Sequence, residues 1–522
     1  MSDTKSVTFA VVAADNGTEI FLIDGNFKLV QKGIGRETFS VPAGIYKIKI
    51  RSGRATSERM IVVQEGMAMI NLDPVLLNSA MPLLHSAKTH EFHMDAARRA
   101  ANAPDLSLGT GSAIVILARL WTAPVPNSST VVPPNPARGL TLLDMTGTVL
   151  VDVEAHTTVN GTFDPCVTLN VELNPGPYRL ALAYEDGRRV EQTLIASPGW
   201  QTQVYLLVDS NAGKDAARAD LINSAITMRK PGEAFDPEDP KLRVEEIARG
   251  ALQDAHNILS DAMRSLITSA GASPMFALMG GHLLIREAKE EVDKSADTPD
   301  AKALLVDNGD ALRRIVDNLR AAIGRHPDVE AIATVAGNAD PDVVFDVPPM
   351  FRASWPLLLN VSVQRPGSIP ATSINARVAE RIWGQGPWLQ WLDAGPDDKV
   401  DRTALWQTRG RELLSSIRAR SQRTTVGAAA ATTTAIVAGT AASVANMAAA
   451  AFLSKAKSFF AQRSHTPFPD LRAVVSSLAE EKAPMDLPGI SAKLTADQRE
   501  ELVKQLGIPM SGINAWLQQL GK

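Results

Sequence analysis

The chain has 522 residues, of which 45% are hydrophobic and 21% charged, and a formal net charge of −4 at pH 7. This length exceeds what one hydrophobic core fills, so we expect two to four domains. The slightly acidic balance argues against a dedicated nucleic-acid binder. A single cysteine, Cys166, excludes an intramolecular disulfide and a multi-cysteine zinc site. The start, MSDTKSVTF, has no apolar run behind a basic head, so we expect no secretory signal and a cytoplasmic location.

Residues 1–75 are expected to form a β-sandwich. Short apolar runs are separated by turn residues, and in YKIKI apolar and basic side chains alternate with the period of two that a half-solvated strand requires. Asp24-Gly25 and Ser52-Gly53 stand where hairpin turns need positive φ angles. These features predict antiparallel strands joined by tight turns.

The same pattern returns over residues 112–210, which predicts a second, related β-sandwich. GLTLLDMTGTVLVDV corresponds to EIFLIDGNFKLV, and LNPGPYRLALAYEDGRRVEQTLIA corresponds to VPAGIYKIKIRSGRATSERMIVV. In both copies a Pro and a Gly precede a tyrosine, Tyr46 or Tyr178, that begins a strand. This arrangement resembles the PEGA-like and other transthyretin-like β modules of bacterial proteins. The resemblance implies a spacer or docking role and no activity.

Residues 76–111 are expected to connect the two sandwiches through a short helix. His85, His90 and His93 fall within nine residues, and imidazole is a common zinc ligand. The spacing differs from the H-E-x-x-H motif, because Met94 stands where the second helical histidine belongs. An exposed connector is therefore the favoured interpretation, and a metal-dependent hydrolase using these three histidines is the weaker alternative.

Residues 211–243 are predicted to be a Pro-rich charged linker, followed by a helical domain over residues 244–400. From Val244 to Ile267 apolar residues recur every three or four positions, as in an amphipathic helix. The domain ends in a segment rich in Pro and Trp. Its tryptophans form either a surface that a partner protein fills or a core between helices, and both alternatives stay open for Trp355, Trp383, Trp388 and Trp391.

Residues 401–465 are a basic and Ala-rich segment, with 31 uncharged residues between Arg423 and Lys455. As one helix these residues would extend about 46 Å, which exceeds the roughly 30 Å hydrocarbon core of a bilayer. Ala, Thr and Gly dominate, so insertion into lipid is expected to be close to neutral. Three alternatives stay open: a membrane-active segment, a buried soluble hairpin and a flexible linker. Small-residue ladders and aromatic side chains favour the first: Gly427, Ala431, Ala435, Gly439, Ser443, Phe452, Phe459 and Phe460.

Basic residues in two segments are candidate cleavage sites for a protease that cuts after Arg or Lys. They are Arg229 and Lys230 in the predicted linker, and Arg418, Arg420 and Arg423 before the Ala-rich segment. Cleavage at these sites is predicted to release the Ala-rich segment from the domains that cover it. Residues 466–522 are expected to form a small helical module.

Stretches between residues 80 and 395 are similar to a family of bacterial accessory or effector proteins. The similar stretches are THEFHMDAARR, IASPGWQTQVYLL, HPDVEAIATVAG and the Trp-rich segment that runs from PPMFRASW to IWGQGPWLQW. Members of this family are associated with caspase-like or CHAT-type proteases in bacterial defence loci. The resemblance implies a protease partner, or a role as protease substrate, and it supplies no catalytic residues.

We therefore expect a multidomain α+β protein, with two small antiparallel β-sandwiches followed by an all-α C-terminal half. The sequence has no G-x-S-x-G motif and no histidine near Cys166, so we expect neither enzymatic activity nor a cofactor. The favoured hypothesis is an effector or protease substrate of an antiviral defence system, whose Ala-rich segment acts on the membrane after cleavage. The alternative is a soluble scaffold that binds partner proteins through its sandwiches and Trp-rich region. Neither hypothesis involves nucleic acid.

Overall fold

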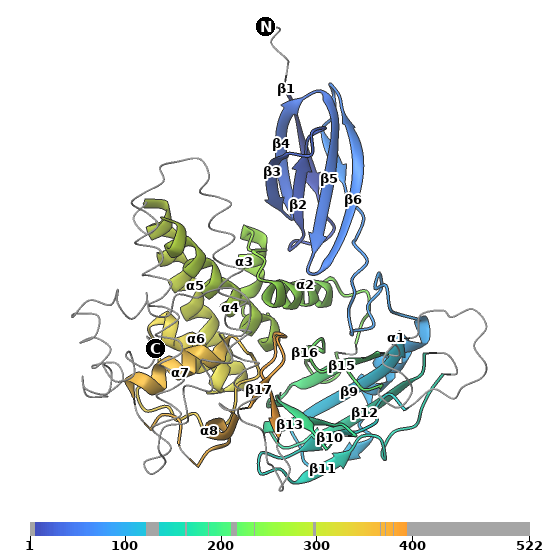
Figure 1. Ribbon diagram of the computed structural model, residues 1–522, viewed down its shortest axis with the longest axis vertical. Coiled ribbons are helices and arrows are strands. Elements are labelled where there is room, and N and C mark those ends of the chain that lie inside the picture. Colours follow the sequence, from blue (N-terminus) through green and yellow to red (C-terminus); the bar gives the residue numbers. More distant parts are fainter. Residues whose placement is uncertain are drawn as a thin grey trace, which may run out of the picture. The chain divides into compact units, whose positions relative to one another are not determined.

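The computed structural model describes residues 6–121, 135–161, 164–185, 187–209, 217–233, 235–295, 299–365, 367–370, 372–378 and 381–393. All of these residues belong to one compact unit, Met1–Asp393. Within it the structure is α+β, with the β-sheets mainly in the N-terminal half and most of the eight described helices after them (Figure 1).

The first seven strands form one sheet, which we call the first β module. They are β1 (Ser6–Val12), β2 (Glu19–Ile23), β3 (Leu29–Ile34), β4 (Arg36–Pro42), β5 (Gly44–Ser52), β6 (Ala55–Val63) and β7 (Met69–Asn71). Their order is β6-β5-β2-β3-β4-β1-β7, so β6 is an edge strand (Figure 1). Side chains alternate between a buried core, which includes Phe9, Ile20 and Ile48, and the opposite side. We call that opposite side of β3, β2, β5 and β6 the outward face.

The second β module consists of two sheets that share one core. One sheet has the order β11-β10-β13-β14-β18-β17 and the other β16-β15-β9-β12-β8. The strands are β8 (Leu106–Ser107), β9 (Ser112–Trp121), β10 (Leu140–Leu143), β11 (Val149–Asp152), β12 (Cys166–Leu173), β13 (Gly176–Ala183), β14 (Arg189–Ala196), β15 (Gln201–Asp209), β16 (Ala225–Arg229), β17 (Ile382–Trp383) and β18 (Gln390–Asp393).

The two modules repeat one topology, as the sequence repeat predicts. The order β6-β5-β2-β3 corresponds to β14-β13-β10-β11, and β4-β1-β7 corresponds to β12-β9-β15. Both copies have an irregularity in register at the equivalent place, between Leu22 and Ile23 and between Leu142 and Leu143. The two tyrosines also have the same role. Tyr46 and Tyr178 each donate a hydrogen bond from the phenol to a carbonyl oxygen four residues earlier, at 3.0 and 2.8 Å respectively.

The helices are α1 (Glu91–Asn102), α2 (Pro240–Asp254), α3 (Asp261–Ile267), α4 (Pro274–Ser295), α5 (Pro299–Ile323), α6 (Pro327–Ala336), α7 (Ser354–Gln364) and α8 (Ile374–Val378). Helix α1 packs on β9 and β12, and α2 and α4 pack on β16. The apolar stripe that begins at Val244 faces this shared core, where Ile247 and Ala251 are fully buried. The helices after α1 are therefore continuous with the second β module.

Several boundaries differ from the sequence-based expectation. The expected linker at 211–243 contains β16 and the first turn of α2, and the expected helical domain at 244–400 contains β17 and β18. The described part of the C-terminal half is therefore not all α. Strands β17 and β18 have only two and four residues, too few to show the alternation of apolar and polar residues that predicts a strand. They form because β18 pairs with the distant strand β14. The sheets are also not purely antiparallel, since β7, β8 and β15 each pair with a parallel neighbour.

Candidate functional site

The outward face of the first β module is partly apolar and solvent-exposed. Met60 on β6 is 61% exposed, and Leu29 on β3 is 51% exposed. Ile45 and Val62, which are direct cross-strand partners on β5 and β6, are also exposed. Several large apolar side chains on one side of one sheet are more than the scattered exposure that is normal for a protein surface. The outward face is therefore the strongest candidate for a functional surface among the described residues.

Basic side chains lie between these apolar residues. Lys32 and Arg51 both bind the buried carboxylate of Glu19, and Lys47 and Lys49 both bind Glu58, at 3.0 and 3.5 Å. The outward face thus has four cations against two carboxylates. Burial opposes ionisation of Glu19, but its hydrogen bonds from Arg51 and Lys32 outweigh burial and lower its pKa. The hydrogen bond from Lys47 lowers the pKa of Glu58. Both carboxylates are therefore ionised at neutral pH, and the face has a net positive charge.

Phe27 presents its ring to solvent from a strained turn between β2 and β3. The Asp24 carboxylate accepts the backbone N–H groups of Asn26 and Lys28, both at 2.9 Å. This turn places Phe27 at φ +61°, in the left-handed region that bulky residues rarely occupy. The Phe27 ring is 80% exposed and lies beneath the Lys47 ammonium, 5.5 Å from it. No core packing therefore explains why a bulky residue stands at this position.

The second β module has the same turn with a glycine instead. Asp144 accepts the backbone N–H groups of Thr146, Gly147 and Thr148 at 2.8 to 2.9 Å. Gly147 corresponds to Phe27, and its φ of +101° is one that glycine adopts without strain. The repeat thus supplies an internal reference in which the turn forms without an aromatic side chain. Backbone strain that is kept without a folding benefit suggests a function for Phe27.

The equivalent face of the second module is covered by the chain itself. Arg179, Glu191 and Thr193 correspond to Lys47, Glu58 and Met60 by strand register. All three residues of the second module are buried. The covering segment places Trp355, Ile374, Val378, Leu389 and Trp391 in one apolar cluster. The surface formed by the last two strands of this sheet is therefore covered in the second copy, over β13 and β14, and exposed in the first, over β5 and β6.

The first β module is held against α2 by buried polar contacts and close backbone packing. Arg243 donates to both carboxylate oxygens of Asp15, at 3.0 and 2.8 Å, and both side chains are buried. Arg54 pairs with Asp254 at 3.1 Å. A Cβ atom on Gly250 would lie 3.0 Å from the Cα of Gly53, so the hairpin between β5 and β6 requires a glycine in α2. These contacts fix one end of the module and leave its outward face free of them.

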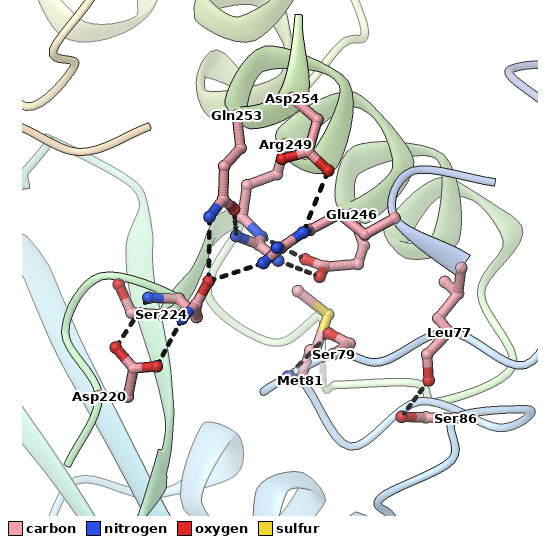
Figure 2. A network of polar contacts seen from close by, with 12 residues as sticks. Leu77, Ser79, Met81, Ser86, Asp220, Ser224, Glu246, Arg249, Gln253 and Asp254 are labelled. Atoms are coloured by element: carbon pink, nitrogen blue, oxygen red, sulfur yellow. Dashed lines mark hydrogen bonds and ion pairs between the residues drawn. The ribbon is translucent and has the colours of Figure 1, made fainter. Parts of the chain in front are cut away.

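A wider polar network continues from this contact into the second module. Figure 2 shows Glu246, Arg249, Gln253 and Asp254 of α2 beside the turn that includes Asp220 and Ser224. Arg249 donates two hydrogen bonds to the Glu246 carboxylate, at 2.8 and 2.6 Å, and both residues are buried. The side chains of this network are bonded to one another, so it has the character of a structural joint rather than a ligand site.

Glu245, on the other side of α2, is buried between three elements. Thr227 of β16 and Ser273, before α4, each donate a hydroxyl hydrogen bond to its carboxylate, at 2.5 Å. Burial raises the pKa of Glu245 to about 7, although these two hydrogen bonds oppose the rise. This carboxyl group therefore titrates near neutral pH inside the junction of sheet and helices.

Three of the four tryptophans proposed as interface residues belong to the interior. Trp355, Trp388 and Trp391 are buried, and Trp388 donates its indole N–H to the backbone oxygen of Ser224, at 2.8 Å. Trp383 is 36% exposed on β17. Of the two alternatives, the core therefore fits the three buried tryptophans, Trp355 on α7 and Trp388 and Trp391 at β18, and none of them is available to a partner.

The histidines near α1 act as structural hydrogen-bond donors and acceptors. The Nε2 of His93 lies 2.8 Å from the backbone oxygen of Asp164, and the Nε2 of His90 lies 3.0 Å from the Asp164 carboxylate. Burial lowers the pKa of His93 to about 4, so this imidazole is neutral at pH 7. His85 is exposed in a turn at φ +56°. Among the described residues, no group of three or more His, Cys, Asp or Glu side chains is arranged to hold a metal ion.

Only one of the two groups of candidate cleavage residues lies in the described part of the chain. Arg229 lies in the hydrogen-bonded strand β16 and pairs with Asp239 at 2.8 Å, so it is not in an open linker. Lys230 follows it and is exposed. Arg418, Arg420 and Arg423 lie outside the described residues. Residues 427–460, with every proposed membrane or helix-packing residue, also lie outside them. Within the described part of the chain, no helix combines the length and the apolar character needed to span a membrane.

A buried cluster that no sequence motif predicts consists of Ser354, His282 and Asp328. The Ser354 hydroxyl donates to the Asp328 carboxylate at 2.6 Å, and it lies 2.9 Å from the Nε2 of His282. The hydroxyl has one hydrogen, so the imidazole must donate to the serine, which is the reverse of a base that activates a nucleophile. Burial lowers the pKa of His282 to about 4, and all three side chains are buried. The cluster joins α4, α6 and α7 within the core.

Comparisons with known proteins add no assignment. No protein-family model matches the chain, and no curated protein sequence matches it.

Proposed function

We propose that this chain is a scaffold protein that binds another protein through the outward face of its first β module. The observation that supports this proposal most directly is the difference between the two modules. The face that the second module covers with its own tryptophan cluster is exposed in the first, with apolar side chains set among lysines. Exposed apolar residues within a polar surround are typical of protein–protein contact surfaces.

Phe27 is the expected anchor of this contact. Aromatic side chains dominate binding energies at interfaces, and the Phe27 ring is almost fully available. Its strained backbone indicates that the ring is kept for a purpose other than folding. The first partner to test is the caspase-like or CHAT-type protease that the family resemblance implies. Release of the Ala-rich segment by such a protease stays a prediction, since it depends on residues beyond Asp393.

Site-specific photocrosslinking tests the proposal. A benzoylphenylalanine introduced in place of Phe27 is expected to give one dominant adduct with a partner in an extract of the source cells. The same residue introduced in place of Val149, which is 53% exposed at the position equivalent to Leu29, should give none. The partner identified in the adduct is then purified and titrated against the whole chain by calorimetry.

A matched pair of substitutions decides the outcome. Leu29→Lys should weaken binding of the purified partner about tenfold, because an apolar contact on the outward face is replaced by a charge. Val149→Lys, at the equivalent strand position of the second module, should leave the affinity unchanged. Equal affinities for the wild type and Leu29→Lys, or adducts of similar yield from both crosslinker positions, would show that the outward face is not the docking surface.

A further inference from the structure

The two modules also differ at a sheet edge. In the second module, β14 pairs on one side with β13 and on the other with β18, in antiparallel register from Arg189–Asp393 to Gln192–Gln390. The strand equivalent to β14 in the first module is β6, and among the described residues β6 pairs only with β5. Thr56 to Met60 are all exposed. Backbone groups on the far side of β6 are therefore available to another strand.

The residues along this edge match those that β18 covers. By register, Glu58 corresponds to Glu191, and Arg59 corresponds to Gln192. Both modules also have an ion pair between diagonal neighbours on these two strands. Lys47 binds Glu58 at 3.0 Å in the first module, and Arg179 binds Glu191 at 2.8 Å in the second. In the covered module, Trp391 stands opposite Glu191, and the Gln390 amide donates to Gln192 at 2.9 Å. A strand that covered β6 in the same way would meet Arg59 where β18 meets Gln192.

We propose that β6 accepts an extended antiparallel strand from a partner protein, as β14 accepts β18. The incoming strand has an apolar or aromatic residue opposite Glu58, beside Met60 on the outward face. It has a carboxylate opposite Arg59, which is the one charged side chain on the core side of the exposed stretch Thr56–Met60. The inference rests on the proposed docking function and specifies the type of partner segment.

A second copy of this chain fits the edge poorly. Two β6 strands that pair in a continuous sheet must keep their outward faces on the same side. Because side chains alternate between the two faces, each residue can then pair only with a residue whose number is also odd or also even. The registers that use the exposed stretch fully are centred on Glu58 or on Arg59. Each sets a charged residue opposite the same residue of the second copy, and like charges directly opposite are destabilising. Glu58 and Arg59 thus each select against one self-paired register, and Arg59 favours an acidic strand.

Peptides derived from β18 test the proposal. The probe is a fluorescently labelled peptide GPWLEWLDAG, which copies residues 386–395 with Glu in place of Gln390. Peptides with Gln or Lys at the same place are the controls. On the full chain we expect saturable binding of the Glu peptide, with roughly five- to tenfold weaker binding of the Lys peptide. Arg59→Glu should reverse that order. Hydrogen exchange should slow at backbone amides within residues 55–63 and stay unchanged in β11, the opposite edge strand of the second module.

The outcomes separate this inference from the proposed function. No saturable binding by any of the three peptides, or an order that Arg59→Glu does not change, would refute strand addition. Binding without protection of residues 55–63 would refute it too. If Leu29→Lys still weakens binding of the crosslinked partner in either case, the docking face remains and only the strand pairing is wrong. If β6 is protected but Leu29→Lys has no effect, the edge is the site and the outward face is not.

Discussion

The two β modules share a topology and differ in what covers them. In the second module, β18 closes one sheet edge, and the tryptophan cluster with Trp355 and Trp391 covers the outer side of the sheet. In the first module, the equivalent edge strand and the equivalent face are exposed. The covered module is continuous with the helical core, whereas the exposed one contacts that core through α2. One repeated unit thus supplies a structural component in one copy and, as we propose, a binding surface in the other.

The same residue positions have opposite energetic roles in the two copies. The Glu191 carboxylate is fully buried, and burial is the main cause that raises its pKa. The negative charge of Asp393 raises this pKa further. The paired cations Arg179 and Arg189 lower it, but by less than burial and Asp393 raise it. Glu58, at the equivalent place, is exposed, and Lys47 lowers its pKa. Whether a carboxylate stabilises the fold therefore depends on what covers it. The following substitutions test this comparison directly.

Trp391→Ala is expected to have the largest effect. Removing this buried indole leaves a cavity between β18 and the helical segment, and large-to-small core substitutions of this kind typically cost about 3 to 5 kcal/mol of unfolding free energy. Met60→Ala, on the edge strand of the first module, should change stability by less than about 0.5 kcal/mol. Urea denaturation of the full chain measures both. Similar losses for the two variants would contradict the difference in covering.

Arg179→Met should be strongly destabilising as well. The substitution leaves the buried carboxylate of Glu191 without one of its cations, and breaking a buried pair in this way costs about 3 kcal/mol. Lys47→Met, at the equivalent position of the first module, should leave the unfolding midpoint unchanged, because the Lys47–Glu58 pair is solvated. Thermal denaturation at low and high salt provides the control, since screening by salt should affect only the surface pair.

Glu245 gives the junction of the second module and the helices a pH dependence. Its folded-state pKa of about 7 lies above the ordinary value of 4.5, so the folded chain keeps a proton that the unfolded chain releases. This contribution to stability is complete below pH 4.5 and is lost as pH rises to about 7. Glu245→Gln cannot titrate and should remove up to about 3 kcal/mol of that decline. Denaturation curves of the wild type and of Glu245→Gln at pH 4.5 and 7.5 measure this loss of stability. His282, with a pKa of about 4, also titrates near the lower pH, but it is present in both proteins and its contribution cancels.

Phe27→Gly should have a small effect of the opposite sign. Glycine relieves the left-handed backbone at this position, which favours the folded state by about 1 kcal/mol. Partner binding should weaken at the same time, because the exposed ring is lost. Gly147→Phe is the reciprocal variant and should destabilise, since a Cβ there would lie 2.6 Å from the Arg179 guanidinium. A loss of stability in Phe27→Gly would instead show that Phe27 supports the fold.

The repeat was predictable because local chemistry determines it. The Pro–Gly turns, the alternation in YKIKI and the tyrosines at 46 and 178 are readable without tertiary information, and the modules follow from them. The apolar stripe from Val244 to Ile267 predicts a helix for the same reason, although the structure divides it into α2 and α3 with Ala255 in the left-handed region after α2. Strand β18 could not be predicted. Its partner β14 lies about 200 residues earlier, and neither strand's sequence specifies the other.

The candidate site was hidden from sequence analysis for a related reason. Met60, Val62 and Leu29 have the same residue types as core positions, and only the covering of the sheet decides which apolar residues are exposed. The tryptophans illustrate the same limit, because a dense aromatic cluster in the sequence can form an interface or an interior, and only the fold decides between the two. Phe27 did leave a signal. It occupies the place of Gly147 in the aligned repeats, and a bulky residue where glycine is suitable marks that turn as unusual.

The late position of β18 also affects how the chain is made. The ribosome completes the first module before residue 76, but β14 emerges long before the strand that closes it. At roughly 5 to 20 residues per second, the edge of β14 stays uncovered for about 10 to 40 seconds on each nascent chain. During that interval β6 and β14 are both open on one side, and among the described residues only β14 is later closed by a strand of the same chain. Neighbouring nascent chains on one messenger RNA could exchange β18 strands in that interval, so slowing translation between β14 and β18 should increase strand-swapped dimers.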